Sequence, residues 1–366
     1  MLHLTLVVAA TAATAVAQPE IRQIDKLDLP SDHSWLGTQV GGISGIDFEP
    51  GWNSWALISD DKGNHGPVRG YLADVQINGD RLTNVEVNLV MPMCWGTGEL
   101  MKGPQYDGES IRFLPHRDYF GEPTLIWASE GAAQQGYPPR LYEVCTGATR
   151  MDSWTAPEWQ RPDGRRSGAK NNRAYESIAI LADRVAMVAT EEPLIQDGDT
   201  FVRLSIFDLN KPESDPVHEY AYPLDPPMKG EPGAQNGLVE LIGLADGRLL
   251  SMERSWTMTA KQSIRIFLVE MEGATDVLGQ DSLNSGGFTG VQKTLLADLG
   301  GSIGNAEGMC LGPKLESGHQ SLILCTDNNF APGIPTSFVL YEIVDPEGKV
   351  VPADRLAPGE ALLGAH

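Results

Sequence analysis

The stretch D-G-E-S-I-R-F, residues 107–113, decides the fold because versions of it recur along the chain. The related stretches are G-I-S-G-I-D-F at 42–48, A-Y-E-S-I-A-I at 174–180, G-L-V-E-L-I-G-L at 237–244 and N-A-E-G-M-C-L at 305–311. The position of the acid in these stretches is held by Ser44, Glu109, Glu176, Glu240 and Glu307. Successive members are 65, 67, 64 and 67 residues apart, and so regular a period is typical of a repeat architecture.

A second apolar stretch follows each of these stretches and ends on a charged residue. The second stretches are W-A-L-I-S-D-D, T-L-I-W-A-S-E, V-A-M-V-A-T-E-E, R-L-L-S-M-E-R and S-L-I-L-C-T-D-N-N, with Asp60, Glu130, Glu191, Glu253 and Asp327 as their terminal acids. A turn-prone segment separates the two stretches of each pair, so each pair predicts a β-hairpin. Because a hairpin returns to the end where it began, both acids of a pair should lie at the same edge.

The composition favours many short strands. The chain has 40 Gly and 25 Pro spread among short apolar runs, and no convincing amphipathic helix stands out. With the repeat, this predicts an all-β protein, a β-propeller of five blades, in which the repeated hairpins are the inner strands. A sixth, irregular blade within 190–236 or 255–304 is the alternative. We expect a strand from residues 20–30 to close the ring.

In such a propeller the common edges of the hairpins converge on one mouth of the central channel, which gathers the repeated carboxylates near the axis. Like charges at short range raise one another's pKa unless a cation or basic side chains compensate them. The arrangement therefore implies Ca²⁺ or a comparable hard cation, together with Lys62, Arg173 and Arg254. The alternative role for such acids is structural, because they can also tie one blade to the next by accepting hydrogen bonds from loop amides.

The motifs in combination resemble the phytase-like family, described as having esterase-like activity of phytase. The resemblance rests on D-G-E-S-I-R-F with A-S-E-G downstream, N-N-R-A-Y-E-S-I-A, R-L-L-S-M-E-R, N-A-E-G-M and T-D-N-N-F, and it covers residues 38–344. It implies an exported β-propeller hydrolase that acts on phosphoesters or carboxyl esters and binds calcium, as propeller phytases do.

Carried over position by position, the resemblance implies two groups of site residues. The candidate catalytic residues are Glu109, Arg173, Glu176, Arg254 and Glu307. The candidate metal ligands are Asp60, Glu130, Glu253, Asp327 and Asn328. The first repeat departs from the pattern because Ser44 stands where the other repeats have Glu, so this blade should contribute through Asp60 and Asp61.

Metal-assisted hydrolysis matches these residues better than a serine mechanism does. The stretch Gly42-Ile43-Ser44-Gly45-Ile46 lacks the final Gly of the G-x-S-x-G elbow, and no helix is predicted after it. A carboxylate-held Ca²⁺ would instead polarise a phosphoryl or acyl oxygen while a neighbouring carboxylate or a metal-bound water attacks. Arg173 and Arg254 would pair with substrate oxygens, because a guanidinium fork matches phosphate and carboxylate geometry.

Three functions fit the sequence. The first is a calcium-dependent phosphoesterase or phytase-like hydrolase, and the second is a calcium-dependent lactonase or carboxylesterase. The third is a non-catalytic propeller that binds a ligand and uses its carboxylates only to hold the blades together. Metal-dependent turnover would separate the first two from the third.

Residues 1–17 form an apolar stretch ending in Ala15-Val16-Ala17, which predicts a cleaved export signal and a periplasmic or extracellular protein. No later segment has the ~18 uninterrupted apolar residues of a spanning helix, so no stable membrane insertion is expected. The propeller domain is expected over 18–344, and 345–366 is expected to be a loose C-terminal tail.

The formal net charge of −22 excludes a general attraction to nucleic acid. The expected partner is a small anionic or ester substrate, and the expected state is a monomer. Four cysteines in an exported chain permit disulfides. Cys310 and Cys325 are expected to face each other across a hairpin and to be bonded, which leaves Cys94 with Cys145 as the second pair.

Overall fold

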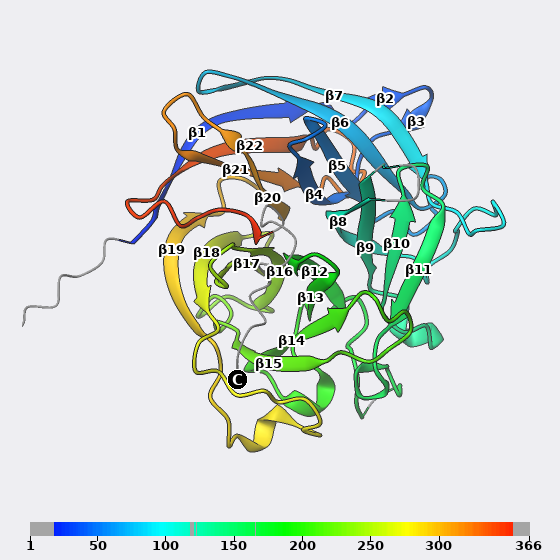
Figure 1. Cartoon of the computed structure of the whole chain (residues 1–366), viewed down its shortest axis with the longest axis vertical. Helices are drawn as coiled ribbons and strands as arrows, with labels where there is room; N and C mark the ends of the chain where they lie inside the picture. The colour runs from blue at the N-terminus through cyan, green and yellow to red at the C-terminus, as the bar shows by residue number, and fades with distance from the viewer. Residues whose placement is uncertain (1–17, 118–120, 122, 165, 354–366) are drawn as a thin grey trace, which may run out of the picture.

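The structure is a computed structural model that describes residues 18–117, 121, 123–164 and 166–353. Five four-stranded antiparallel sheets surround one central axis (Figure 1). The inner strand of each sheet contacts the inner strands of its two neighbours. The chain is a five-bladed β-propeller, as the repeat predicts, and the segments 190–236 and 255–304 hold outer strands and loops of the third and fourth blades rather than a sixth blade.

Each blade begins with the inner strand. The first blade consists of β4 (Ile43–Glu49), β5 (Ser54–Ser59), β6 (Arg69–Asn78) and β7 (Arg81–Pro92), and the second of β8 (Gly108–Arg117), β9 (Pro123–Ser129), β10 (Arg140–Cys145) and β11 (Arg150–Thr155). The third consists of β12 (Tyr175–Ala182), β13 (Val185–Thr190), β14 (Phe201–Asp208) and β15 (His218–Pro223), and the fourth of β16 (Gln235–Gly243), β17 (Leu249–Trp256), β18 (Gln262–Glu270) and β19 (Gln292–Gly300). The fifth consists of β20 (Ala306–Lys314), β21 (Gln320–Thr326), β22 (Thr336–Val344) and β1 (Glu20–Leu29).

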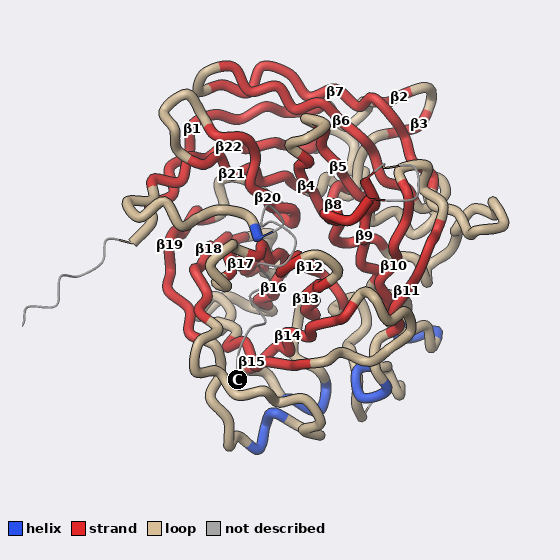
Figure 2. Tube along the Cα trace, in the orientation of Figure 1, coloured by secondary structure: helices blue, strands red, loops and turns tan. Residues whose placement is uncertain are grey.

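The remaining elements are small and lie in the connections. Strands β2 (Ser34–Trp35) and β3 (Thr38–Gln39) form a short hairpin, and the 3₁₀ turns are η1 (Ala133–Gln135), η2 (Glu158–Gln160), η3 (Ile195–Asp197) and η4 (Leu283–Ser285). Figure 2 shows how completely strands dominate the ring, and the described residues contain no α-helix. None of the helical segments among them is long and apolar enough to cross a bilayer.

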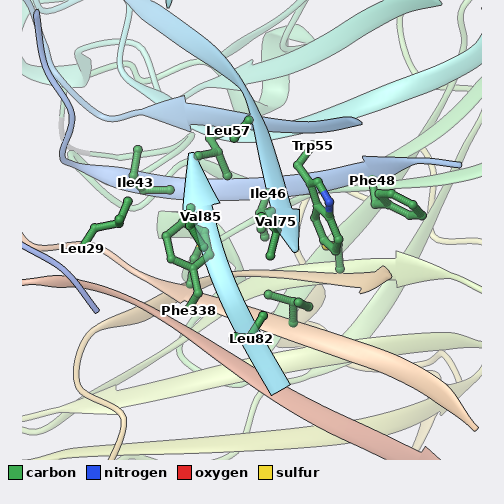
Figure 3. Packing of buried hydrophobic residues seen from close by; sticks show 14 of the residues in the cluster. Leu29, Ile43, Ile46, Phe48, Trp55, Leu57, Val75, Leu82, Val85 and Phe338 are labelled. Atoms are coloured by element: carbon green, nitrogen blue, oxygen red, sulfur yellow. The ribbon is translucent and has the colours of Figure 1, made fainter. Parts of the chain in front are cut away.

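The two ends of the propeller domain close the ring together. Strand β1 pairs antiparallel with β22, from Glu20 opposite Val344 to Leu29 opposite Thr336, which confirms the closing strand predicted from residues 20–30. The interface between the first and fifth blades is a buried apolar cluster that includes Leu29, Trp55 and Phe338 (Figure 3). Burial of this cluster stabilises the closure because its members come from both ends of the chain.

The repeated acid occupies a β-bulge. Each inner hairpin skips one residue near its start, and the skipped residues are Ser44, Glu109, Glu176, Val239 and Glu307. A bulge leaves one residue unpaired and turns the strand locally. The sequence pattern therefore marks a repeated local geometry in addition to a repeated strand.

The fourth blade corrects the sequence alignment by one residue. Its bulge lies at Val239, so Glu240 is one position farther along the strand than Glu109, Glu176 and Glu307 are in theirs. In the same blade Leu238 pairs with Glu253 and Gly237 pairs with Arg254. Arg254 therefore takes the place of the terminal acid, and Glu253 was wrongly aligned with Glu130.

The predicted disulfides are not formed, because all four cysteines are free thiols. Cys310 pairs with Ile323 and Cys325 pairs with Gly308, so the two cysteines are offset by two residues along the hairpin rather than opposite each other. Cys94 bridges to Thr149, and the backbone of Cys145 bonds to the same Thr149 from the other side of the hairpin turn. Thr149 therefore lies between the cysteines of the second predicted pair.

The structure describes none of the predicted export signal and only the first part of the predicted C-terminal tail. The predicted export signal, residues 1–17, lies outside the described residues, as does 354–366 of the predicted tail. Residues 345–353 pack against the ring, because Pro352 bridges to Leu244 and both Val350 and Ala353 are buried. This part of the C-terminal segment belongs to the propeller.

One side chain joins all five blades at the axis. The buried guanidinium of Arg112 donates hydrogen bonds to one backbone carbonyl of every inner strand: Ile46, Ile111, Ile178, Leu241 and Met309, at 2.7–3.4 Å. It also forms an ion pair with the buried Glu240 at 2.6 Å. All five N–H donors of the guanidinium are thereby satisfied, and the channel is blocked by side chains at this level.

We expect Arg112→Met to lower the free energy of unfolding by about 3–5 kcal/mol, because the change leaves Glu240 as an uncompensated buried charge and removes a hydrogen bond from each inner strand. Arg22→Met is the control, since that exposed arginine pairs only with acids at the surface and should change stability by at most about 0.5 kcal/mol. Urea unfolding measures both variants. Equal stability of the two would show that Arg112 does not hold the ring.

Candidate functional site

Three positions recur in every blade at the end of the inner hairpin nearest the mouth of the channel. The first lies just before the inner strand or within its first residues, the second is the bulge, and the third lies within the last residues of the second strand or just after it. A backbone hydrogen bond or strand pair joins the first position to the third in every blade. The five sets are Gly42, Ser44 and Asp60; Asp107, Glu109 and Glu130; Ala174, Glu176 and Glu191; Gly237, Val239 and Arg254; and Asn305, Glu307 and Asp327.

Only the second blade has an acid at all three positions. Ligand oxygens of Asp107, Glu109 and Glu130 lie within 4.8 Å of one another, and all three residues are buried. We call these residues the carboxylate triplet. Asp107 Oδ1 and Glu130 Oε2 have no hydrogen-bond partner among the described residues, although neither is accessible to solvent. Buried oxygens without a partner are costly, so the triplet lacks a positive or donor group at its centre.

The groups that do contact the triplet leave those two oxygens free. Lys62 forms an ion pair with Asp107 through Oδ2. The backbone N–H of Ala174 donates to Glu130 Oε1 at 2.7 Å. The donor set that remains is made of carboxylate oxygens, which is the chemistry that Ca²⁺ and other hard cations bind. The triplet can therefore hold a metal ion.

A second group of close carboxylates is already balanced by arginines. Glu130, Glu176 and Glu191 also place oxygens within 4.8 Å of one another. Both oxygens of Glu191 are engaged, by Arg173 Nη1 at 2.9 Å and by Arg254 Nη2 at 3.2 Å. This group shares Glu130 with the triplet but has less room for an ion.

The two arginines hold carboxylates along one wall of the mouth. Arg254 pairs with Glu307 as well as Glu191, and it donates to Asn305 Oδ1 at 2.7 Å. Arg173 pairs with Glu192 as well as Glu191, and its guanidinium carbon lies 5.7 Å from the ring centre of Trp256. Substrate contact through these guanidinium groups would compete with ion pairs that are already formed.

A cavity of about 470 Å³ opens at the mouth above these groups, and we call it the main cavity. Its acidic lining residues are Asp60, Glu109, Glu176, Glu191, Glu307 and Asp327, and its basic ones are Lys62, Arg173 and Arg254. Trp256 and Met258 form a less polar part of the wall, where Met258 is 79% exposed. The cavity therefore combines a strongly acidic floor with one apolar side.

Burial and mutual repulsion raise the pKa of most acids at the mouth, namely Asp60, Asp107, Glu109, Glu130, Glu176, Glu191 and Asp327. Desolvation is the largest cause for every one of them, followed for most by a neighbouring carboxylate. It raises the pKa of Asp107 and of Glu130 to about 8 and that of Asp327 to about 7. Burial and then Asp327 raise the pKa of Asp60 well above its ordinary value, and burial and nearby acids do the same for Glu109 and Glu176.

The structure brings most of the sequence-predicted site residues together. The predicted site residues that line the main cavity are Asp60, Glu109, Arg173, Glu176, Arg254, Glu307 and Asp327. Glu130 lies beside them in the triplet. The side-chain oxygen of Asn328 accepts hydrogen bonds from the backbone N–H groups of Gly42 and Phe330, both at 3.0 Å, so it links the fifth blade to the first.

Glu253 and Glu240 lie apart from the mouth. Fully buried Glu253 accepts hydrogen bonds from Tyr222 and Asn236 at 2.7 Å each and pairs with Lys293. These contacts join β15 of the third blade to β16 and β19 of the fourth. Glu240 lies deeper in the channel, on Arg112. Both differences follow from the one-residue shift of the fourth blade.

Sequence reasoning left Asp107 and Glu191 out of the candidate site. Asp107 stands two residues before Glu109 within the motif itself, but only the second repeat has an acid at that position, so a repeat comparison does not select it. Glu191 ends its strand as Glu130 does, and this equivalence was the available signal.

The raised pKa values predict that stability falls as pH rises. Unfolded Asp and Glu titrate near about 4, whereas folded Asp107 and Glu130 titrate at about 8, so the folded state binds more protons between these values. The free energy of unfolding should therefore decrease from about pH 4 to 8 in chelator. Urea unfolding across this range measures it, and calcium should flatten the decrease. A profile in chelator that rises over this range would contradict the prediction.

Comparison with solved structures finds only distant similarity. The chain is similar to a hypothetical protein from Leishmania major, with 10% identity, 91% of this chain and 94% of that chain covered and a TM-score of 0.41. It is similar to an exo-β-1,3-galactanase from Phanerochaete chrysosporium, with 13% identity, 90% and 67% covered and a TM-score of 0.47. Scores this low support no functional comparison.

A search of curated proteins matched none of them. The family model described as "Phytase-like: Esterase-like activity of phytase" matches residues 38–330, which is most of the chain and includes every mouth position listed above. The chain belongs to the phytase-like family.

Proposed function

We propose that the protein is an exported, cation-assisted hydrolase of ester bonds, with its reaction centre in the main cavity. The observation that carries the proposal is the carboxylate triplet, in which Asp107 Oδ1 and Glu130 Oε2 are buried beside Glu109 and have no hydrogen-bond partner in the described part of the chain. Membership of the phytase-like family supports the reaction class.

Charge balance supports a single divalent cation at the triplet. Three ionised carboxylates carry three negative charges, and Lys62 supplies one positive charge by its ion pair with Asp107. A divalent ion would complete neutrality. Ca²⁺ is the ion that we propose, because it prefers oxygen ligands and tolerates irregular geometry.

The chain's own residues would divide the chemistry between them. When bound, the cation would polarise the oxygen of the scissile group. Asp60 is the proposed general base: it lines the main cavity, its carboxyl makes no hydrogen bond with the described residues, and burial raises its pKa, which makes the carboxylate a stronger base. A water would lose its proton to Asp60 as its oxygen bonds to the acyl or phosphoryl centre. The bond to the leaving oxygen then breaks, and that oxygen takes up the proton from Asp60, which returns Asp60 to its carboxylate form.

The lining of the main cavity favours an uncharged carboxylic ester. Six carboxylates face it against three basic groups, and the arginines are engaged by acids. A dianionic phosphate would be repelled by this field unless further cations accompanied it. The apolar side at Trp256 and Met258 gives an acyl group a surface to contact. This reverses the order expected from the sequence, in which the phosphoester came first.

Phosphoester hydrolysis is the second candidate, because the family description names phytase and because Arg173 and Arg254 line the same cavity. A non-catalytic propeller would use the same carboxylates without turnover. Export is a proposal that rests on residues 1–17 and on the family. We also propose that the protein is a monomer and that it binds a small substrate.

The first test is hydrolysis of p-nitrophenyl acetate and p-nitrophenyl phosphate, each with calcium and with excess chelator. We expect calcium-dependent turnover of the acetate, and Glu130→Gln should lower its kcat/KM by about 100-fold or more because the change removes a cation ligand. Glu253→Gln is the matched control, since Glu253 lies outside the mouth. Turnover of the phosphate alone would favour the second candidate, and no turnover of either ester would favour a binding protein.

Asp60→Asn tests the proposed base. The variant should lower kcat for p-nitrophenyl acetate by about 10²–10⁴-fold, the usual contribution of a positioned base. Calcium affinity, measured by titration calorimetry, should stay close to that of the parent because Asp60 is not in the triplet. Unchanged kcat would assign the proton transfer to another group.

A further inference from the structure

Lys62 lies at the boundary between two cavities. It follows β5 of the first blade and lines both the main cavity and a smaller one of about 180 Å³, which we call the side pocket. Its Nζ pairs with Asp107 and donates to Asn172 Oδ1 at 2.5 Å. The ammonium group thus connects the second blade to the loop before the third and separates the two cavities.

The side pocket is lined mainly by groups that carry oxygen ligands. They are the carboxylates of Asp107 and Glu130 and the side-chain amides of Gln134, Gln135, Asn171 and Asn172. Lys62 is the one cationic group among the described lining residues. A volume of 180 Å³ is that of about six waters at ~30 Å³ each, which is enough for a cation that keeps part of its hydration shell.

The ammonium is held by the same acids that form the carboxylate triplet. Lys62 forms an ion pair with Asp107, and the carboxylates of Glu109 and Glu130 are close enough to attract the ammonium as well. An ammonium group at this place repels any further cation that approaches from the side pocket. Asp107 pairs with Lys62 through Oδ2, and its other oxygen, Oδ1, has no hydrogen-bond partner among the described residues.

We propose that Lys62 is a built-in monovalent cation that limits the carboxylate triplet to one divalent ion, and that the side pocket is a second cation site which its ammonium group keeps closed. The inference rests on the proposed function, because it assumes the cation at the triplet. It assigns the side pocket a ligand class, a hard divalent cation held by carboxylate and amide oxygens. It also gives Lys62 a role that does not require contact with substrate.

Calorimetric titration of chelator-treated protein with calcium tests the proposal without measuring activity. The wild type should bind one ion and Lys62→Met two, because methionine keeps the length of the side chain but removes the charge. Lys62→Arg keeps the charge and should again bind one ion. Lys261→Met is the matched control, since Lys261 pairs with Glu231 and contributes to neither cavity lining.

Each outcome bears on a different claim. Two ions in Lys62→Met against one in the wild type, the Arg variant and the Lys261 control support the inference. Equal numbers of ions and equal affinities in the wild type and Lys62→Met overturn it, even if turnover depends on calcium. Absence of binding in both overturns the cation at the triplet, and this inference with it.

If Lys62→Met is poorly folded, Asn172→Ala provides a second variant. Loss of the hydrogen bond from Lys62 to Asn172 should let the ammonium move, so that a second calcium ion binds with lower affinity. An unchanged single ion would count against the inference.

Discussion

The contact between Arg112 and the five inner strands sets the conditions for the rest of the molecule. Each of these strands presents a backbone carbonyl to the axis, and a single planar guanidinium with five donors satisfies one carbonyl from each. The arginine carries its own counter-ion in Glu240, so the buried charge is paired. Because the axis is filled at this level, the main cavity has a floor and opens toward one face.

Above this floor, the bulges convert a repeated hairpin into a repeated functional position. A regular pair would point alternate side chains away from the axis, whereas a skipped residue at the start of each inner strand turns one side chain toward the mouth. The resulting positions are then filled unequally. The second blade has three acids, the third and fifth have two each, the first has one, and the fourth has Arg254. Basic groups follow the same division, with Lys62 beside the triplet and two arginines beside Glu191.

The sequence predicted the parts of this arrangement that depend on period. A spacing of 64–67 residues is sufficient to count blades, and a hairpin must return to its starting edge, so the convergence of Glu109, Glu130, Glu176 and Glu307 followed from topology alone. The spacing of the repeats does not reveal a shift of one residue within a repeat. In the fourth repeat the bulge is at Val239, and Arg254 takes the position of the terminal acid. The motif instead selected the neighbouring acids Glu240 and Glu253, each one residue away. The cysteine pairs failed for a related reason, since a hairpin of unknown register does not say which residues are opposite.

The residues at the equivalent mouth positions differ from blade to blade, and this difference makes one part of the ring a candidate site. Five equal acids would repel one another equally and would hold a cation, if any, on the axis. Replacement of an acid by Arg254, with Val239 at the neighbouring bulge, moves positive charge to the fourth blade and draws Glu191 and Glu307 toward it. The carboxylate triplet is left with Lys62 as its only basic partner among the described residues, and Lys62 forms an ion pair with Asp107 alone of the three acids. Asymmetry among the repeats, which a search for common residues discards, therefore locates the place where a cation is needed.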